Sequence, residues 1–479
     1  MLLSLICLPF IGALVLLFIK EENTSIIKNF SLFWSLFIFN YSLIFFIFFD
    51  NLSLHFQYLQ RIEWLHLSNI NIVFGLDSLG LYMILLTTFL IPICILLSWN
   101  DSLKNDTKFY NISFFLLEAI LLGVFSSLDI LVFYVLFEAV LIPMYFIVGS
   151  FGSRERRIRA SYMLFLYTLI SSVFMFIAIL FIYNQTGTTD YMILRTVELG
   201  VNIERFCWFA FFLSFAVKMP LVPFHVWLPE AHCEAPTAGS VILAGILLKL
   251  GGFGFLRYSL GLFPDSSAFF APLIFTISCF GVVYASITTL QQVDLKKIIA
   301  YSSVGHMGLV TIGIFSMNMQ GILGSILLMI SHGIVSSALF ICIGILYERH
   351  HTRVLKYYSG LIHTMPLFSV SFIIFTLGNI GLPGTSSFIG EFLILLGAFS
   401  VNNVVALISG TGMILGAGYS LWTCNRMLFG NIKLYSIQQF RDLNRFEFCM
   451  LLPFILLVFI IGLYPEIIIN IMKCNLHIL

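Results

Sequence analysis

The stretch Phe215–Trp227, FAVKMPLVPFHVW, places a lysine, two prolines and a histidine inside a long apolar run. Lys218 carries a charge, and Pro220 and Pro223 each remove a backbone donor and interrupt a helix. A charged side chain costs at least about 2.5–3.5 kcal/mol at the centre of a membrane helix. The stretch therefore either lies outside a membrane or uses the charge and the break for its function.

Composition indicates a polytopic membrane protein. Of the 479 residues, 60% are hydrophobic, 16% are aromatic and only 10% are charged, whereas soluble domains average about 25% charged residues. The formal net charge of +1 indicates neither a nucleic acid nor an acidic partner. The nine cysteines are scattered and form no C-x-x-C pair of the kind that binds zinc or an iron–sulfur cluster.

Runs of about 20 apolar residues, the length that crosses a bilayer as a helix, predict an all-α fold of fourteen transmembrane helices. Asp129 alone separates the fourth span from the fifth, and the twelfth span is long and is interrupted by GLPGTSS (381–387). The expected spans are 2–19, 30–49, 78–98, 111–127, 129–149, 160–183, 207–227, 237–258, 268–290, 298–316, 320–346, 365–400, 403–428 and 447–467.

Basic residues in the loops alternate between the two sides of this arrangement. Seventeen lie on one side of the membrane, and only five lie on the other, namely Arg61, Arg195, Arg205, Arg257 and Lys473. Lys and Arg concentrate in loops that are not translocated. Because the number of spans is even, we expect both termini on the outward side, which is poor in basic residues.

Five charged residues lie deep within the predicted spans, away from their ends: Glu118, Glu138, Lys218, Lys249 and Glu391. Ionisable groups at membrane depth are rare and typically mark ion or proton pathways. A satisfied buried carboxyl explains Glu118 as well as proton transfer does. The apolar surroundings of Glu138, and the depth of the two lysines, favour a functional role for these three.

Histidines add titratable groups near these charges. His306 and His332 lie in consecutive spans beside serines and glycines that leave room for water. A single histidine on an apolar helix is more often a hydrogen-bonding core residue, but two on consecutive spans favour proton transfer. His225 and His232 lie toward a loop and fit either role.

Other motifs favour structural roles. Asp77 is expected to cap the third span, and Gly251, Gly252 and Gly254 are expected to allow close helix contact. The sequence contains no dinucleotide fingerprint, P-loop lysine or potassium-channel filter. We therefore expect no nucleotide, flavin, haem or metal site in this chain.

Two predicted spans are broken, the seventh at Pro220 and Pro223 and the twelfth at Pro383 and Gly384. Irregular backbone at depth must be buried in protein or line a wet cavity. Paired broken helices are typical of inverted-repeat transporters whose site lies at the midplane. The expected divisions are helices 1–3 (1–110), a first inverted repeat of helices 4–8 (111–258), a second of helices 9–13 (259–430) and helix 14 (431–479).

The breaks lie where helix dipoles favour the nearby charges. Lys218 ends one half-helix, and Glu391 lies just over a turn into another. A helix end stabilises such a charge by about 1–2 kcal/mol at best, which is too little to keep the lysine charged unaided. Neighbouring charges must decide its proton affinity, and Glu138 is its expected partner.

Several segments resemble one known family. The chain is similar to the antiporter-like subunits of proton-pumping NADH:ubiquinone oxidoreductase (respiratory complex I) and to the Mrp-type sodium/proton antiporters. The combination of motifs is typical of the subunit 4 family of complex I in its mitochondrial form. The segments are VLFEAVLIPMYFIVG (135–149), AVKMPLVPFHVWLPEAHCEAPTAGSVILAGILLKLGGFGFLR (216–257), QQVDLKKIIAYSSVGHMG (291–308), LLMISHGIVSSALF (327–340) and LPGTSSFIGEFLIL (382–395).

The resemblance implies a fourteen-helix subunit in the distal membrane arm, with a hydrated row of titratable residues. NADH, FMN, iron–sulfur clusters and ubiquinone would be bound by other subunits, and none by this chain. Its partners would be other membrane-arm subunits, including antiporter-like neighbours, and lipids of the mitochondrial inner membrane, with both termini toward the intermembrane space. The implied proton-transfer residues are Glu138, Lys218, Lys249, His306, His332 and Glu391, with Glu118 and His225 as accessory candidates.

Three alternatives remain open from the sequence. The first is a stand-alone Mrp-type antiporter subunit, and the second is a plastid relative that works with plastoquinone. The third is a scaffold subunit in which the buried charges only hold helices together.

Overall fold

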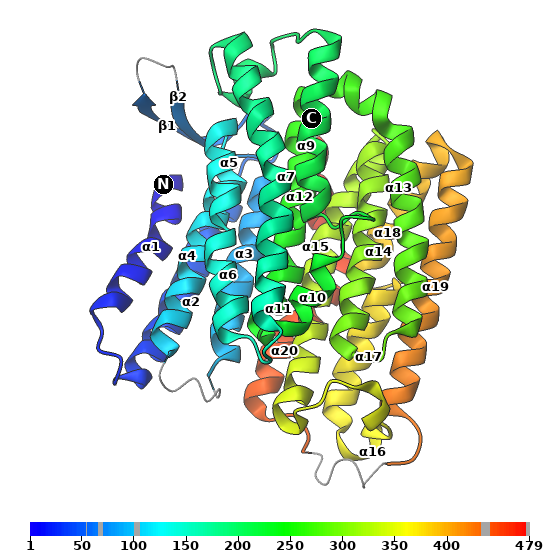
Figure 1. Cartoon of the computed structure of the whole chain (residues 1–479). Helices are drawn as coiled ribbons and strands as arrows, with labels where there is room; N and C mark the ends of the chain where they lie inside the picture. The colour runs from blue at the N-terminus through cyan, green and yellow to red at the C-terminus, as the bar shows by residue number, and fades with distance from the viewer. Residues whose placement is uncertain (54, 66–69, 100–105, 433–440, 476–479) are drawn as a thin grey trace.

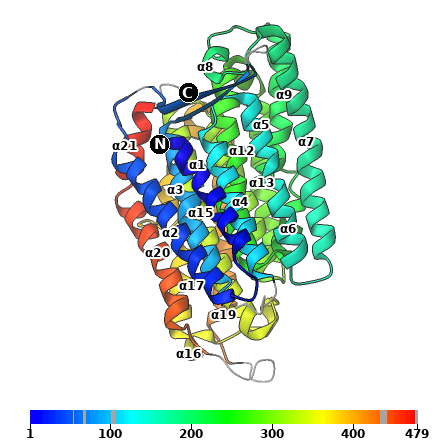
Figure 2. The same ribbon diagram turned by 90° about the vertical axis from the view of Figure 1, so that its left-hand side faces the viewer.

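The fold is described from a computed structural model, which covers residues 1–53, 55–65, 70–99, 106–432 and 441–475. Long helices run side by side, and a two-stranded hairpin lies at one end of the bundle, opposite α16 (Figure 1). The start of α1 and the C-terminal α21 lie toward the hairpin end (Figure 2). The N-terminal helices and α20 share one face of the bundle in the same view.

Each of the fourteen ranges predicted to span the membrane contains helix. The helices are α1 (Leu2–Phe18), α2 (Thr24–Ile47), α3 (Ser78–Leu97), α4 (Thr107–Ser126), α5 (Ile130–Ala139), α6 (Leu141–Phe151), α7 (Arg157–Thr186), α8 (Tyr191–Leu194), α9 (Val201–Lys218), α10 (Trp227–Glu234), α11 (Thr237–Ile242), η2 (Leu243–Leu247), α12 (Leu248–Gly254), η3 (Phe255–Leu260), α13 (Pro264–Gln291), α14 (Leu295–Phe315), α15 (Met319–His350), η4 (Leu355–Tyr357), α16 (Leu361–Thr364), α17 (Pro366–Ile380), α18 (Ser386–Val401), α19 (Asn403–Leu428), α20 (Arg445–Leu463) and α21 (Glu466–Asn475).

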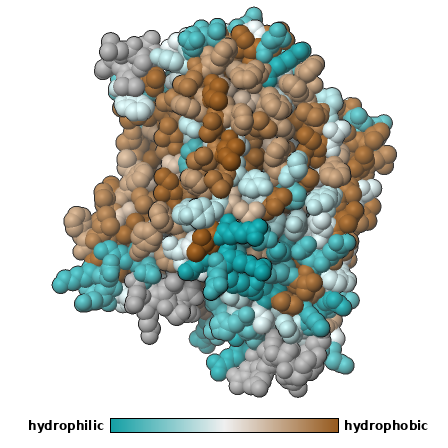
Figure 3. All heavy atoms as spheres, viewed as in Figure 1, coloured by the Kyte–Doolittle hydropathy of each residue, from teal (hydrophilic) through white to brown (hydrophobic). Residues whose placement is uncertain are grey.

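Among the described residues, eleven helical stretches are long and apolar enough to cross a membrane, and α1, α17 and α18 are shorter apolar helices. In α15 and in Thr237–Leu260, every residue of the most apolar window is buried, whereas α2, α19 and α20 bury a third or less of theirs. A helix that is apolar all round belongs in the interior. The face in Figure 3 is broadly hydrophobic, with hydrophilic residues gathered toward the α16 end, as a membrane-embedded bundle requires.

The prediction of an all-α fold is wrong between α2 and α3. There β1 (Gln57–Leu65) and β2 (Ile70–Leu76) pair antiparallel, with Ile62 opposite Ile72. β2 is too short to span a membrane, and its β-branched and aromatic residues suit a half-buried strand. The hairpin is tied to the bundle, because the Leu128 N–H donates to the Val73 carbonyl (2.8 Å) and the Leu3 N–H donates to Gln60 (2.8 Å).

Both predicted helix breaks are confirmed. The first separates α9, which ends at Lys218, from α10, which begins at Trp227. The second separates α17 from α18. Gly381 (φ +77°) and Gly384 (φ +94°) adopt left-handed backbone there, which glycine reaches without the steric cost of a side chain.

Two further irregularities were not predicted. The eighth predicted span is not a regular α-helix, because π-helical turns η2 and η3 flank the short α12 that carries Lys249. The fifth span changes from α5 to α6 at Val140, where the ring of Pro143 prevents a regular hydrogen bond to the Ala139 carbonyl.

Gly251 brings α12 into close contact with the end of α9, as the sequence predicted. A Cβ atom at this position would lie 2.8 Å from Met219 Cβ and 2.9 Å from the Phe215 carbonyl oxygen. The absence of a side chain therefore sets the distance between the helix of Lys249 and the half-helix of Lys218.

We expect Gly251→Ala to lower stability by about 1–3 kcal/mol, because it overpacks this contact. The measurement is the midpoint of thermal unfolding in detergent. Gly418→Ala is the matched control, since nothing lies within 4 Å of a Cβ built there. Equal midpoints for the two variants would show that the contact is not tight.

Candidate functional site

Four of the six predicted residues form a continuous buried series across α12, α15, α14 and α18. The Lys249 Nζ lies 2.9 Å from Nδ1 of His332. The rings of His332 and His306 have centroids 5.6 Å apart, and His306 Nδ1 lies 3.4 Å from Glu391 Oε1. Neighbouring members are therefore within direct reach, or within reach through one water.

Burial of this series leaves hydrogen-bonding positions free for water. Lys249 is 0% exposed and Glu391 is 2% exposed. The Nε2 of His332 and the Oε2 of Glu391 have no hydrogen-bond partner among the described residues. Leaving a buried polar group unpaired costs about 1–3 kcal/mol in proteins, so these atoms favour ordered water beside them.

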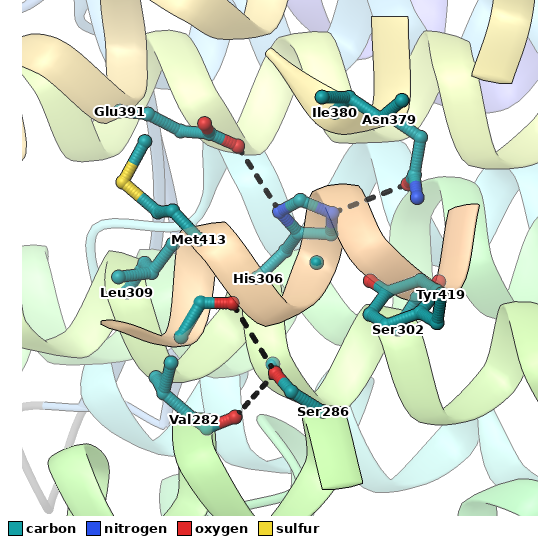
Figure 4. A pocket seen from close by; sticks show the side chains of 13 residues that line it. Val282, Ser286, Ser302, His306, Leu309, Asn379, Ile380, Glu391, Met413 and Tyr419 are labelled. Carbon is teal, nitrogen blue, oxygen red and sulfur yellow. Dashed lines mark hydrogen bonds and ion pairs between the residues drawn. The ribbon is translucent and has the colours of Figure 1, made fainter. Parts of the chain in front are cut away.

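A cavity lined by both polar and apolar side chains lies beside His306. Figure 4 shows the His306 ring between Glu391 and Asn379, with Ser286, Ser302 and Tyr419 also lining the cavity. The Asn379 side-chain oxygen lies 3.2 Å from His306 Nε2. The cavity is roomy enough for a water molecule and offers several polar partners, as buried water requires.

The second helix break positions Glu391. Gly381 lies directly against the Glu391 carboxylate, so any side chain at Gly381 would collide with it. The Ser387 hydroxyl donates to the Gly378 carbonyl, which ties α18 to the end of α17. The Ser331 hydroxyl donates to the Ser386 carbonyl (2.9 Å), which ties α18 to α15.

Lys218 is the last residue of α9 and reaches toward α5. Its Nζ donates to the Phe137 carbonyl (2.6 Å) and lies 3.3 Å from the centroid of the Phe137 ring. The ammonium therefore contacts the residue before Glu138, and no ion pair between Lys218 and Glu138 occurs in the described part of the chain. Glu138 is half-buried, and its Oε1 has no partner there.

A small, mostly apolar cavity lies between Lys218 and the π-helical turn η2. It is lined by Lys218, Thr168 and Trp227, and by Leu243 and Leu247 of η2, among others. The Lys249 Nζ donates to the carbonyl of Ala244, also in η2. No hydrogen bond joins the two lysines within the described ranges, so η2 and this cavity separate them.

The accessory candidates do not contact the series. Glu118 on α4 is 0% exposed, and neither carboxylate oxygen has a hydrogen-bond partner in the described residues. His225 lies in the turn before α10, with its ring 5.5 Å from Tyr284 and 6.1 Å from Tyr301. Among the described residues, neither side chain is hydrogen-bonded or ion-paired to a member of the series.

His232, which fitted either role from the sequence, and Lys296, which the sequence did not indicate, are buried near the series. His232 on α10 stacks on Phe340 of α15 (4.7 Å between centroids), and the charges of Lys296 and Lys249 act on it. Lys296, which was expected in a loop, is buried and donates to the Ala235 carbonyl (2.9 Å). The sequence around His232 did not indicate that α10 is buried in the bundle.

The described residues contain no group of three His, Cys, Asp or Glu that could hold a metal ion.

Comparisons with known proteins agree on one family. Residues 127–418 match the family described as NADH:quinone oxidoreductase/Mrp antiporter, TM. The chain is 56% identical over 472 residues to NADH-ubiquinone oxidoreductase chain 4 of Marchantia polymorpha, covering 98% of this chain and 95% of the relative. It is 45% identical to chain 4 of Metridium senile, covering 97% and 95%.

Solved structures share the fold. A chain of respiratory complex I from Thermus thermophilus superposes with a TM-score of 0.90 at 27% identity, covering 100% of this chain and 99% of that one. A chain of the Mrp complex from Dietzia sp. superposes with a TM-score of 0.87 at 19% identity, covering 99% and 96%, which shows the fold alone. The chain belongs to the NADH-ubiquinone oxidoreductase chain 4 family and is an antiporter-like membrane subunit of that enzyme.

Proposed function

We propose that the chain translocates protons along the buried row Glu138, Lys218, Lys249, His332, His306 and Glu391. NADH oxidation and ubiquinone reduction take place in other subunits, which also hold the redox cofactors. The observation that carries this proposal is the contiguous series from Lys249 to Glu391, in which every member is titratable and buried. Such groups inside a membrane bundle are the materials of a proton relay.

The proposal extends to topology and surroundings. Fourteen transmembrane helices comprise two inverted repeats, 111–258 and 259–430, flanked by 1–110 and 431–479. The matching positions of the two broken helices, α9–α10 and α17–α18, support this division. The subunit lies in the mitochondrial inner membrane with both termini toward the intermembrane space, beside other membrane-arm subunits.

Glu138 drives the first step through its charge. Two unit charges about 5 Å apart interact by roughly 3 kcal/mol at an effective dielectric of 20. Moving a proton against about 100 mV costs about 2.3 kcal/mol. Neutralising Glu138, or moving it away, therefore suffices to send the Lys218 proton through the cavity by η2 to Lys249, and then to His332, His306 and Glu391.

The identity of the relatives favours this function over a stand-alone antiporter. Relatives at 45–56% identity are named chain 4 of NADH-ubiquinone oxidoreductase, whereas the Mrp chain is only 19% identical. Membership of a redox enzyme, NADH-ubiquinone oxidoreductase, thus distinguishes this chain from an Mrp subunit of the same fold.

We expect Lys218→Ala and Glu138→Ala each to abolish the contribution of this subunit to pumping and to slow coupled turnover. Assembly and NADH oxidation by artificial acceptors should stay largely intact, because no redox step involves these residues. The measurement is the ratio of protons pumped to electrons transferred in vesicles. Lys20→Ala and Glu21→Ala, at exposed positions, are the matched controls.

Shape-conserving variants separate the relay from a scaffold. Lys218→Met and Glu138→Gln remove charge and keep volume. A scaffold role predicts that these variants lose assembled complex, whereas the relay predicts normal assembly with lost pumping. Full pumping stoichiometry in either variant would refute the relay assignment.

We expect His306→Gln to stop transfer between His332 and Glu391, because an amide keeps the hydrogen bond to Asn379 but does not carry a proton. The proton-to-electron ratio should fall by as much as in Lys218→Ala. His363→Gln, at an exposed position, should change nothing. An unchanged ratio in His306→Gln would place the lateral route elsewhere.

A further inference from the structure

Arg257 lies buried between Lys249 and the hairpin end of the bundle. It follows Lys249 by eight residues, a rise of about 12 Å at 1.5 Å per residue. The sequence placed it in a loop, yet it is only 1% exposed. A permanent positive charge therefore lies two turns beyond the central lysine of the proposed relay.

The guanidinium of Arg257 is fixed by four separate parts of the chain. It forms an ion pair with Asp77, the cap of α3, and donates to the Ser127 carbonyl (3.3 Å) after α4. Its central carbon lies 4.4 Å from the centroid of the Phe253 ring and 5.6 Å from that of Phe56. Its Nε has no hydrogen-bond partner in the described residues.

Orientation matters because Asp77 balances the charge of Arg257. Phe253 lies one turn after Lys249 and one turn before Arg257, and the guanidinium lies against its ring. Asp77 lies on the hairpin side, at the start of α3, where it also accepts from the Gly80 N–H (2.8 Å). A buried cation paired with Asp77 therefore lies two turns beyond Lys249 on the same helical segment.

Aromatic rings fill the space between the two cations. The Phe253 ring lies 5.2 Å from Phe125 and 6.4 Å from Phe133, and the Phe133 ring lies 4.4 Å from Tyr258. The direct way from Lys249 to the hairpin end is thus both apolar and positively charged.

The corresponding region beyond Glu391 is different. The cavity beside Glu391 and His306 has no lysine or arginine in its lining. Toward the same end of the bundle, Asn318 on the turn before α15 donates to the Gly397 carbonyl (2.8 Å) and to the Ser400 hydroxyl (2.7 Å). These groups are neutral, so neither they nor the cavity lining sets a fixed cation against a proton.

We propose that Arg257 is an electrostatic barrier that prevents proton exchange between Lys249 and the hairpin side. An arginine in a narrow pathway excludes protons by its charge, and its guanidinium stays protonated. This role rests on the proposed relay and gives it direction: a proton on Lys249 leaves only sideways, through His332 and His306 to Glu391. Arg257 is a positioning residue and does not itself carry the transported proton.

The test is the passive proton conductance of the purified complex in vesicles, without NADH, under a potassium-diffusion potential and with a pH-sensitive dye inside. The variant Arg257→Gln with Asp77→Asn removes both charges and keeps a hydrogen-bonding pair. We expect conductance to rise at least about tenfold, with a lower proton-to-electron ratio and unchanged NADH oxidation by artificial acceptors. Adding Lys249→Ala should abolish the leak, because the leak starts at that lysine.

Two single variants test whether charge or shape matters. Arg257→Lys and Asp77→Asn both keep a cation at the barrier and should stay as tight as the unaltered complex, whereas a merely structural plug predicts a leak in both. Arg205→Gln, which removes an arginine over Phe269 near the same end, is the matched control.

The barrier proposal would be wrong if the double variant conducted protons no faster than the unaltered complex. It would also be wrong if Arg205→Gln conducted protons as fast as the double variant. If the double variant does not assemble, the leak in Arg257→Lys and Asp77→Asn decides the same question. If the leak persists after Lys249→Ala, the leaking proton does not pass through Lys249, and the proposed relay through this lysine is wrong. An unchanged conductance in the double variant, by contrast, contradicts the barrier alone.

Discussion

The contact between the Lys249 ammonium and the His332 imidazole, 2.9 Å long, joins the two halves of the chain. Lys249 belongs to the segment that also carries Lys218 and Glu138, whereas His332 belongs to the segment with His306 and Glu391. Both residues are buried, and no bulk solvent reaches them. Every other feature of the candidate pathway either brings a proton to this contact or carries one away from it.

Helix irregularity places the titratable groups. A regular helix satisfies its own carbonyls and leaves none for a buried cation. Here the first break ends α9 at Lys218, the π-helical turn η2 offers the Ala244 carbonyl to Lys249, and the second break brings Gly381 against Glu391. A helix end stabilises a nearby charge by only about 1–2 kcal/mol. The two helix breaks and the π-helical turn therefore stabilise the buried charges without fixing their protonation states. The charge states thus remain sensitive to neighbours such as Glu138.

Local pattern was sufficient to predict much of this arrangement. Apolar length gave the fourteen helical ranges, and the proline and glycine clusters gave both breaks. Charges at membrane depth, together with the family resemblance, gave the six residues of the proposed row. These features are encoded within a few residues of each other, which is why one sequence reveals them.

Tertiary contacts account for what the sequence did not predict. The hairpin of β1 and β2 forms because the bundle end offers partners such as the Leu128 N–H. Arg257 and Lys296 looked like loop residues, but Asp77 and the carbonyl of Ala235 receive them in the interior. Lys218 makes its direct contact with Phe137 and no ion pair with Glu138, which nevertheless lies near enough to interact with the lysine through its charge. This geometry depends on how α5 and α9 face each other.

A structure of the assembled membrane arm with individual waters visible tests the central claim most directly. We expect an unbroken chain of waters and side chains from Lys218, past η2, to Lys249, and from His332 through His306 to Glu391. We also expect no water between Lys249 and Arg257. A dry gap on the way from Lys249 to Glu391 in every state of the turnover cycle would contradict the account.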